Sequence, residues 1–496
     1  MATEVKAASA LTAAAPKLPP ARLFIGGEWV EAEGGRTFAT ENPATEEVIC
    51  AVASAGAADV DRAVAAAKAA LAGDWKKLSA RERGRLLWKI ADALEARIDE
   101  FALLETLDNG KPIFESRYVD VPAAIDALRY FAGWADKVTG ETLPIGGPFV
   151  LAYTLREPVG VIAAITPWNF PLIQALWKIA PALACGNTVV HKPASYTPLT
   201  ALKFAELASE AGLPPGVLNV LPGRGSEVGN ALVEHPEVAK ITFTGSTEVG
   251  KDIMRGAAAT VKRVTLELGG KSPNIVFADA DLDAAVKGAY NGIFYGKGEV
   301  CAAGSRLFVE AKVHDELVER LVERTKKLVP GDPLDPRTRL GALVSGKQRE
   351  TVLGYVEEGR REGARVVHGG EAVAIGGKGY FLQPTILDGV TNEMKVAQEE
   401  IFGPVLVTIP FEDAKDAVRQ ANASIYGLAA GVWTRDIGKA HQVARDLQAG
   451  TVWINQYNWY DSGMPFGGYK QSGFGRELGS QALEYYTETK SVFVGK

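Results

Sequence analysis

The stretch "VGVIAAITPWNFPLIQALWKIAPALACGNTVVHK", residues 159–192, decides the fold class. It opens with the continuous apolar run 159–166, bounded by proline and glycine, which is typical of a strand buried on both faces. An apolar segment of helical length follows at 171–186, and a second strand is predicted at 187–192. A strand, a helix and another strand in succession indicate a parallel sheet.

The same alternation continues beyond this stretch. Helices are predicted at 198–212 and 247–259, and strands at 216–223, 238–245 and 261–270. Strands that alternate with helices indicate a doubly wound α/β fold, in which ligands bind at the carboxyl ends of the parallel strands.

A second alternating series starts at 273–294 and returns in the apolar runs 405–411, 426–434 and 450–456. We therefore expect a second α/β domain, which agrees with a chain of 496 residues, longer than one hydrophobic core usually fills. Residues 56–137 carry apolar residues at helical spacing and are predicted to be mainly helical.

Three segments lie outside both series. The β-like stretches 146–158 and 491–496 are expected to pair as an added sheet at a subunit interface. The Ala-rich residues 1–20 lack a basic segment leading into a solid apolar core, so we interpret them as a disordered tail rather than a signal peptide.

Composition excludes several classes of partner. A net charge of −6 and a pI of about 5.7 argue against a nucleic-acid or anionic-membrane surface. No apolar run approaches the roughly 18 residues of a membrane span. The three cysteines and five histidines are scattered without metal-ligand spacing, so we expect a reduced, cytoplasmic compartment and no metal.

Cys301 lies in "GIFYGKGEVCAAGSR", residues 292–306, between small residues and before a stretch that we expect to be helical. Small neighbours allow close backbone approach and leave an N–H near the sulfur, as a nucleophilic thiol requires. Cys185, at the end of a predicted helix, and Cys50, in a predicted strand, are interpreted as core residues.

Polar residues follow several predicted strands. The amide of Asn169, in "TPWNFP", suits an oxyanion, although an asparagine that caps the next helix is the alternative. Glu267, in "LELGGK", is either a general base or a solvated charge. Gly245 and Ser246, in "FTGSTEVG", offer N–H groups and a hydroxyl to a phosphate. The usual dinucleotide fingerprint fails, because "GRGSEVG" is one residue too long.

Together these features resemble the aldehyde dehydrogenase superfamily over nearly the whole chain, from "NPATEE" to "GYKQSGFGRE". The motifs, in the family's order, are "PWNFP", "FTGSTEVG", "LELGGKSPNIVF", "GEVCAAGSR", "EEIFGPV" and "PFGGYKQSG". The resemblance implies a dimer or tetramer and the following division: 1–20, disordered tail; 21–140 and 159–267, nucleotide-binding domain; 268–479, catalytic domain; 141–158 and 480–496, oligomerisation segments.

The resemblance implies an NAD(P)-dependent oxidation of an aldehyde to its acid. Cys301 would attack the aldehyde carbon to give a thiohemiacetal, whose oxyanion the Asn169 amide and the Cys301 N–H would hold. Loss of hydride to the nicotinamide would leave a thioester, and Glu267 would activate the water that hydrolyses it.

The same resemblance implies the cofactor site. Glu400 would hold the nicotinamide ribose, Lys192 the adenine ribose, and Trp168 with Ser246 the pyrophosphate. The full predicted set is Ile165, Thr166, Trp168, Lys192, Ser195, Gly225, Gly245, Ser246, Leu268, Glu400 and Phe402. Many NAD-preferring members carry glutamate where this chain has Ser195, so we expect NADP to be accepted alongside NAD.

By family position, six aromatic residues would line the tunnel to Cys301: Phe170, Trp177, Tyr295, Trp459, Tyr460 and Phe466. Because the set includes no Arg or Lys, a substrate carboxylate would be desolvated without a partner. We expect medium-chain aliphatic or aromatic aldehydes to be favoured. Betaine aldehyde, held by cation–π contact, is an alternative. A CoA-acylating enzyme and a non-catalytic protein of the same fold are two further alternatives.

The segment before Cys301 departs from the family pattern, which usually shows Asn, a variable residue, Gly and Gln. This chain has Gly296, Lys297, Gly298 and Glu299. A carboxylate at 299 would raise the pKa of the thiol if it faced the sulfur, and the lysine would lower it.

Overall fold

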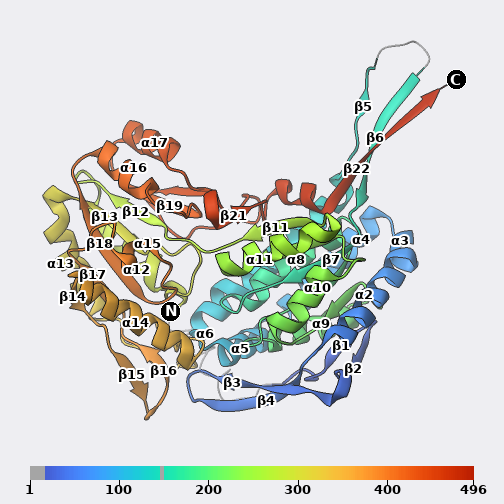
Figure 1. The fold of residues 1–496 in the computed structure, drawn as a ribbon, viewed down its shortest axis with the longest axis horizontal. Helices are drawn as coiled ribbons and strands as arrows, with labels where there is room; N and C mark the ends of the chain where they lie inside the picture. The colour runs from blue at the N-terminus through green and yellow to red at the C-terminus, as the bar shows by residue number, and fades with distance from the viewer. Residues whose placement is uncertain (1–16, 146–149, 496) are drawn as a thin grey trace.

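The computed structural model describes residues 17–145 and 150–495. Its strands form two large sheets, which lie side by side, and a narrow arm that projects from the side of the first sheet (Figure 1). Residues 1–16 of the predicted tail, 146–149 of a predicted oligomerisation segment and residue 496 lie outside the described residues.

The first sheet has the strand order β2-β1-β9-β8-β7-β10-β11-β21. Its central strands, from β9 to β11, run parallel, which confirms the predicted doubly wound α/β class. Antiparallel strands flank this parallel centre at both edges. The bounds are β1 (Leu23–Ile25), β2 (Glu28–Val30), β7 (Val161–Ile165), β8 (Thr188–Lys192), β9 (Leu218–Val220), β10 (Lys240–Thr244), β11 (Arg263–Glu267) and β21 (Gly473–Phe474).

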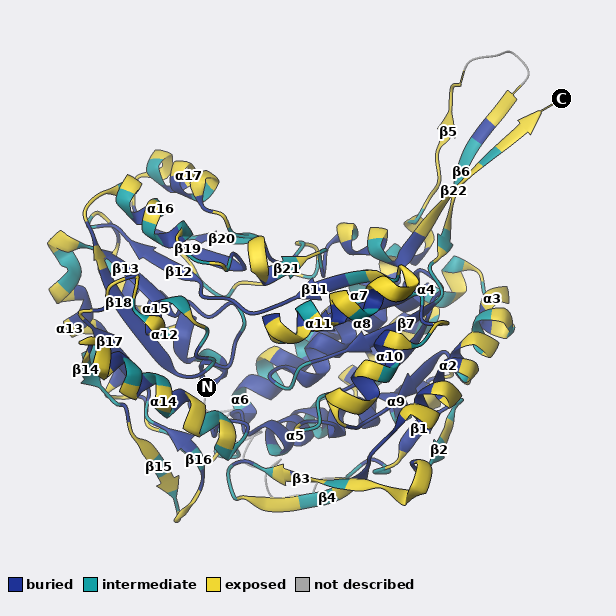
Figure 2. Cartoon of the chain, viewed as in Figure 1, coloured by how far each residue is buried: buried dark blue, intermediate teal, exposed yellow. Residues whose placement is uncertain are grey.

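Every residue of strand β7 is apolar, which fits a strand whose two faces are both covered by helices. Ile162 and Ala164 belong to a core cluster shared with helices α4, α7, α8 and α9. Val161, Ala163 and Ile165 belong to the opposite cluster, shared with α2, α10 and α11. Figure 2 shows the resulting buried centre beneath partly exposed helices.

Residues 56–137 are mainly helical, as the apolar spacing predicts, and a capping box of Ser79 and Glu82 starts α4. Helix α8 starts with Pro171 in its first turn, where proline is well tolerated, and every residue of it is buried. The bounds are α2 (Ala57–Ala72), α3 (Asp74–Lys77), α4 (Ala80–Glu95), α5 (Ile98–Asn109), α6 (Ile113–Glu115), α7 (Val121–Trp134), α8 (Pro171–Ala184), α9 (Leu199–Glu210), α10 (Asn230–Glu234) and α11 (Thr247–Ala257).

The second sheet has the strand order β14-β17-β18-β13-β12-β19-β20 and is parallel except at β14. The segment after Cys301 was expected to be helical and that expectation is wrong, because it forms the central strand β13. The strand bounds are β12 (Pro273–Val276), β13 (Arg306–Glu310), β14 (Arg365–His368), β17 (Thr385–Asp388), β18 (Val405–Phe411), β19 (Ala429–Trp433) and β20 (Thr451–Ile454).

The helices that follow β11 along the chain are α12 (Leu282–Phe294), α13 (His314–Thr325), α14 (Gly346–Glu362), α15 (Lys395–Gln398), α16 (Ala414–Asn422) and α17 (Ile437–Asp446). Within 17–145 and 150–495, no helix is long and apolar enough to cross a membrane.

The sequence does not predict two hairpins that the structure contains. They are β3 (Thr37–Asn42) with β4 (Glu47–Ala53) and β15 (Ala372–Ile375) with β16 (Lys378–Leu382). The arm contains β5 (Thr142–Leu143), β6 (Val150–Pro158) and β22 (Thr487–Gly495). β22 pairs antiparallel with β6 along its whole length, so the two β-like segments do form an added sheet.

Candidate active site

The predicted site residues come from the carboxyl ends of neighbouring parallel strands. Asn169 follows β7, Lys192 ends β8, Gly245 follows β10, and Glu267 ends β11. Cys301 reaches the same edge from the second sheet, in the turn before β13. Carboxyl ends of parallel strands are where open α/β folds bind ligands.

Gly270 and Cys301 lie in very close contact. A Cβ atom at Gly270 would stand 2.4 Å from the carbonyl oxygen of Cys301, so only glycine fits there. This glycine therefore lets the loop after β11 approach the cysteine turn, and it brings Glu267 and Cys301 together although they belong to different sheets.

Asn169 faces the loop of Cys301. Its Nδ2 donates to the backbone carbonyl of Glu299 at 2.9 Å, and among the described residues its Oδ1 has no hydrogen-bond partner. The N-cap residue of α8 is Phe170, so the helix-cap alternative for Asn169 is wrong. One N–H of the amide is thus engaged with Glu299, which leaves the other for an oxyanion.

Glu267 is buried, at 2% exposure, so the alternative of a solvated charge is wrong. Within the described part of the chain neither carboxyl oxygen has a hydrogen-bond partner by geometry. Burial raises the pKa of Glu267 to about 8; the charge of Glu477 adds to the rise and that of Lys178 opposes it. A carboxyl whose pKa lies near the working pH suits a general base.

The Cys301 thiol and the Glu267 carboxyl are near enough to influence each other's pKa. Burial raises the pKa of Cys301 well above its ordinary value, and the Glu267 charge raises it further. The Glu299 carboxylate pairs with Lys297 at 2.8 Å.

Lys178 and Glu477 are site residues that the sequence interpretation missed. Lys178 lies in the buried helix α8, and its Nζ donates to Thr244 Oγ1 at 2.6 Å and pairs with Glu477. A lysine inside a mainly apolar helix is the local signal that could have identified it.

The predicted cofactor residues gather along the carboxyl edge of the first sheet. Glu400 Oε1 accepts from Gly270 N at 3.1 Å, and burial raises the pKa of this carboxyl to about 7. Phe402 and Trp168 pack edge to face, with ring centroids 5.1 Å apart. Ile165 and Thr166 at the end of β7, and Leu268 just after β11, are buried.

Lys192 and Ser195 follow β8. Lys192 Nζ donates to the Pro193 carbonyl at 2.8 Å, and burial lowers the pKa of this lysine to about 8. Ser195 donates to the carbonyl of Gly223 at 2.8 Å, two residues before Gly225.

One expectation about the phosphate loop needs correction. Gly245 N donates to the Glu267 carbonyl at 3.1 Å, so this N–H is not free for a phosphate. A Cβ at Gly245 would lie 2.4 Å from the Phe243 ring, which explains the glycine. Ser246 caps α11 by accepting from Val249 N at 3.5 Å, and its own O–H stays available to a ligand.

A cavity of about 300 Å³ opens on Cys301, and all six predicted aromatic residues line it. Trp177 and Tyr460 each pack against Phe466, at centroid distances of 5.6 and 5.5 Å. Trp459 is 69% exposed and marks the mouth. The described lining includes no charged side chain; the residues that the sequence interpretation missed are Val119, Ala123, Ile173, Gln174, Val300 and Asn458.

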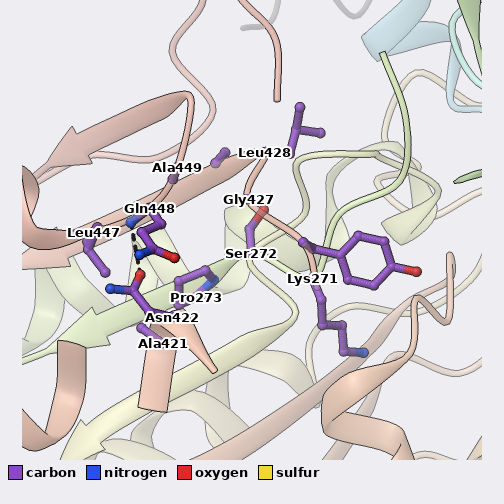
Figure 3. A pocket seen from close by; sticks show the side chains of 12 residues that line it. Lys271, Ser272, Pro273, Ala421, Asn422, Gly427, Leu428, Leu447, Gln448 and Ala449 are labelled. Carbon is purple, nitrogen blue, oxygen red and sulfur yellow. Dashed lines mark hydrogen bonds between the residues drawn. The ribbon is translucent and has the colours of Figure 1, made fainter. Parts of the chain in front are cut away.

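A second cavity beside Lys271, of about 10 Å³, has room for about one water molecule and cannot hold a substrate (Figure 3). Asn422 and Gln448 close it through a 2.8 Å hydrogen bond from the Gln448 backbone. The described residues also include no group of three His, Cys, Asp or Glu side chains that could hold a metal ion.

Known proteins are similar to this chain over nearly its whole length. Residues 29–492 match the model of the aldehyde dehydrogenase family. A mitochondrial aldehyde dehydrogenase of Rattus norvegicus is 52% identical over 95% of this chain and 91% of its own length. The solved NAD+ complex of a Bacillus cereus aldehyde dehydrogenase is 51% identical, with a TM-score of 0.94 and 96% of each chain covered. An indole-3-acetaldehyde dehydrogenase of P. syringae, solved with NAD+ and IAA, is 47% identical, with a TM-score of 0.96 and 99% of each chain covered.

Proposed function

Because the chain belongs to the aldehyde dehydrogenase family, we propose that it oxidises an aldehyde to the carboxylic acid through a thioester on Cys301, with NAD as oxidant. One observation carries the proposal, the arrangement of three groups around Cys301. The Cys301 side chain lines an apolar cavity, its thiol interacts with the Glu267 carboxyl, and its loop accepts a hydrogen bond from Asn169. Nucleophile, base and oxyanion donor thus come from three different strand ends.

In the first step the Cys301 sulfur bonds to the aldehyde carbon, and the thiol proton is released to solvent through the cavity. The aldehyde oxygen becomes an oxyanion. The second N–H of Asn169 Nδ2 and the backbone N–H of Cys301 donate to it. Since this charge exists only after the attack, both donors favour the transition state over the substrate.

When bound, NAD would supply the hydride acceptor that oxidation to a thioester on Cys301 requires. Glu400, Phe402, Trp168 and Ser246 would hold it along the carboxyl edge. The site fits such a group: among the described residues Lys192 Nζ bonds only the Pro193 carbonyl, which leaves donors for a ribose hydroxyl or a phosphate.

In the last step Glu267 takes a proton from water and the resulting hydroxide attacks the thioester carbon. The acid leaves as the Cys301 sulfur takes that proton from Glu267 and becomes a thiol again. A base buried near the sulfur favours water over coenzyme A as the acceptor of the acyl group. Detection of free acid rather than an acyl-CoA would separate these two outcomes.

For the substrate we propose medium-chain aliphatic and aromatic aldehydes. The lining around Cys301 is almost wholly apolar, and burying apolar surface is worth about 25 cal/mol per Å². A quaternary ammonium aldehyde is a second candidate, supported by the cluster of Trp177, Tyr460 and Phe466, because such rings attract cations.

We further propose a cytoplasmic homo-oligomer, a dimer or a tetramer, that forms through the arm. Leu151 and Phe493 on the arm are 53% and 68% exposed, and apolar surface of this kind is typical of an interface. All three cysteines are free thiols, as a reducing compartment would keep them. Light scattering of wild type and of Phe493→Asp tests the assembly, which the charge should weaken.

The activity is tested by absorbance of the reduced cofactor with a panel of aldehydes, followed by identification of the acid. Cofactor reduction with stoichiometric acid is expected. A panel of aliphatic, aromatic and cationic aldehydes that yields neither would reject the proposal.

A further inference from the structure

A buried ion pair lies inside the loop that leads to Cys301. Lys297 Nζ and Glu299 Oε2 are 2.8 Å apart, and both side chains are at most 1% exposed. Removing two charges from water is unfavourable and is compensated only where further hydrogen bonds satisfy both groups. The hydrogen bonds that Lys297 and Glu299 make to other residues therefore show which parts of the protein this ion pair fixes in place.

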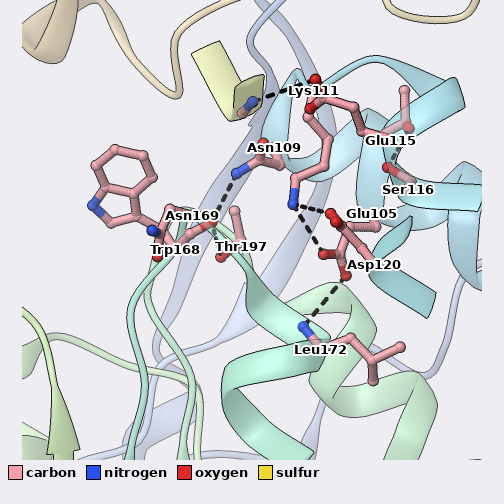
Figure 4. A network of polar contacts seen from close by, with 12 residues as sticks. Glu105, Asn109, Lys111, Glu115, Ser116, Asp120, Trp168, Asn169, Leu172 and Thr197 are labelled. Carbon is pink, nitrogen blue, oxygen red and sulfur yellow. Dashed lines mark hydrogen bonds and ion pairs between the residues drawn. The ribbon is translucent and has the colours of Figure 1, made fainter. Parts of the chain in front are cut away.

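Lys297 reaches the end of helix α5. Its Nζ donates to the carbonyl oxygen of Asn109 at 2.9 Å and to its Oδ1 at 2.7 Å. The Asn109 Nδ2 in turn donates to the Trp168 carbonyl at 2.7 Å (Figure 4). Lys297 is thus linked to the residue directly before Asn169.

Glu299 reaches Asn169 from the other side. Its backbone carbonyl accepts from Asn169 Nδ2 at 2.9 Å, and its Oε1 accepts from Val344 N at 3.1 Å. The carboxylate is therefore fixed at two points, while the backbone of the same residue fixes the amide. Lys297 thus closes a ring of contacts that runs through Asn109, Trp168, Asn169 and Glu299.

The backbone at Lys297 indicates the same role. Its φ of 63° and ψ of 20° lie in the left-handed region, between Gly296 at φ 57° and Gly298 at φ 70°. Glycine tolerates this conformation, but a residue with a Cβ is strained in it and keeps it only where its surroundings fix it. Here the contacts to Asn109 and Glu299 fix it.

We infer that Lys297 is a positioning residue for the acylation step: through Asn109 and Glu299 it holds the Asn169 amide at the place where the oxyanion forms. This inference rests on the proposed function. It assigns Lys297 no contact with substrate or cofactor, and its effect must therefore pass through Asn169.

The test is a double-mutant cycle on the rate of the first turnover, read as the burst of reduced NAD. Asn169→Ala should slow the burst about 10²- to 10³-fold through loss of an oxyanion donor. Lys297→Met should slow it about 10- to 100-fold, because a small displacement of a catalytic group has an effect of this size. In the Asn169→Ala background the same Lys297→Met change should cost less than about 2-fold.

An equal loss in both backgrounds would overturn the inference, since a general loosening of the fold does not depend on Asn169. Lys287→Met, the same substitution at an exposed position of α12, is the matched control and should leave the burst unchanged.

Lys297→Met leaves Glu299 buried without its counter-charge, so the chain with this single change can fail to fold. The cycle is then run with Lys297→Met combined with Glu299→Gln, which removes both charges and keeps the acceptor for Val344 N. If the two substitutions slow the burst additively and the wild type is active, only the role of Lys297 is contradicted. A wild-type chain that reduces no NAD with any aldehyde contradicts the proposed function as well.

Discussion

The hydroxyl of Ser195 donates a hydrogen bond to the backbone carbonyl of Gly223, 2.8 Å away, and ties the loop after β8 to the loop after β9. Lys192 lies three residues earlier on the same edge. The pair thus presents a cation and a neutral side chain to the proposed adenine ribose, with no carboxylate from Ser195 to repel a 2′-phosphate.

Ser195→Glu should therefore raise the dissociation constant of NADP about 10-fold or more and change that of NAD much less, because a like charge would face the phosphate. Titration of both cofactors measures it. Ser195→Ala is the control, since it removes the bond to Gly223 without adding charge. An equal loss for both cofactors in Ser195→Glu would show that this position does not sense the phosphate.

Rapid kinetics should distinguish the role of the nucleophile from that of the base. Cys301→Ala is expected to abolish oxidation, while Glu267→Gln should keep a burst of reduced cofactor and slow steady turnover by about 10²-fold or more, the size of a general-base contribution. Stopped-flow absorbance distinguishes the phases. Normal steady turnover in Cys301→Ala would remove the cysteine from the mechanism.

Steady-state turnover should rise with pH. Burial raises the pKa of Glu267 to about 8, and the base acts only after losing its proton, so kcat should increase through about pH 8 and then level off. A kcat profile from pH 6 to 10 measures this, with Glu267→Gln as the control that should lose this limb. A wild-type kcat that is flat across pH 8 would contradict the assignment.

Glu267→Gln should also make the protein more thermostable. Between about pH 4.5 and 8 the unfolded chain has lost the Glu267 proton that the folded chain keeps, so wild-type stability falls through this window. The Tm advantage of Glu267→Gln should be small near pH 4.5, widen up to pH 8 and then stay constant. Calorimetry at several pH values tests it; an advantage that shrinks as pH rises from 5 to 8 would contradict the buried carboxyl.

The cavity predicts a ranking of substrates. Hexanal and benzaldehyde should give higher kcat/KM than acetaldehyde or succinic semialdehyde, because they bury more apolar surface and carry no carboxylate. Trp177→Ala should lower kcat/KM for benzaldehyde about 10-fold, whereas Trp88→Ala, at an exposed tryptophan outside the cavity, should not. A preference for succinic semialdehyde would reject this interpretation of the cavity.

Much of the fold was predictable because it depends on local pattern. The apolar run of β7 reveals a strand covered on both faces, and Ile162 and Val161 do pack into opposite clusters. The strand after Cys301 was mispredicted as a helix, because its neighbours in the sheet come from distant parts of the chain.

The site was predictable only in part. Asn169, Glu267 and Cys301 occur in short motifs, and the structure brings them to one edge. Lys178 escaped notice because its partner Glu477 lies about 300 residues away, and no local pattern connects the two. The engagement of the Gly245 N–H with Glu267 likewise depends on strand register.

The short strand β21 has a consequence for the order in which the molecule is built. It pairs Gly473 with Glu267, and Ser472 Oγ donates to the Gly269 carbonyl across 203 residues of sequence. During synthesis from the N-terminus, β11 therefore waits as an unpaired sheet edge until the second sheet has been made. Such an edge invites pairing with other chains, so a nascent polypeptide is exposed to aggregation at the strand that carries the proposed base, Glu267.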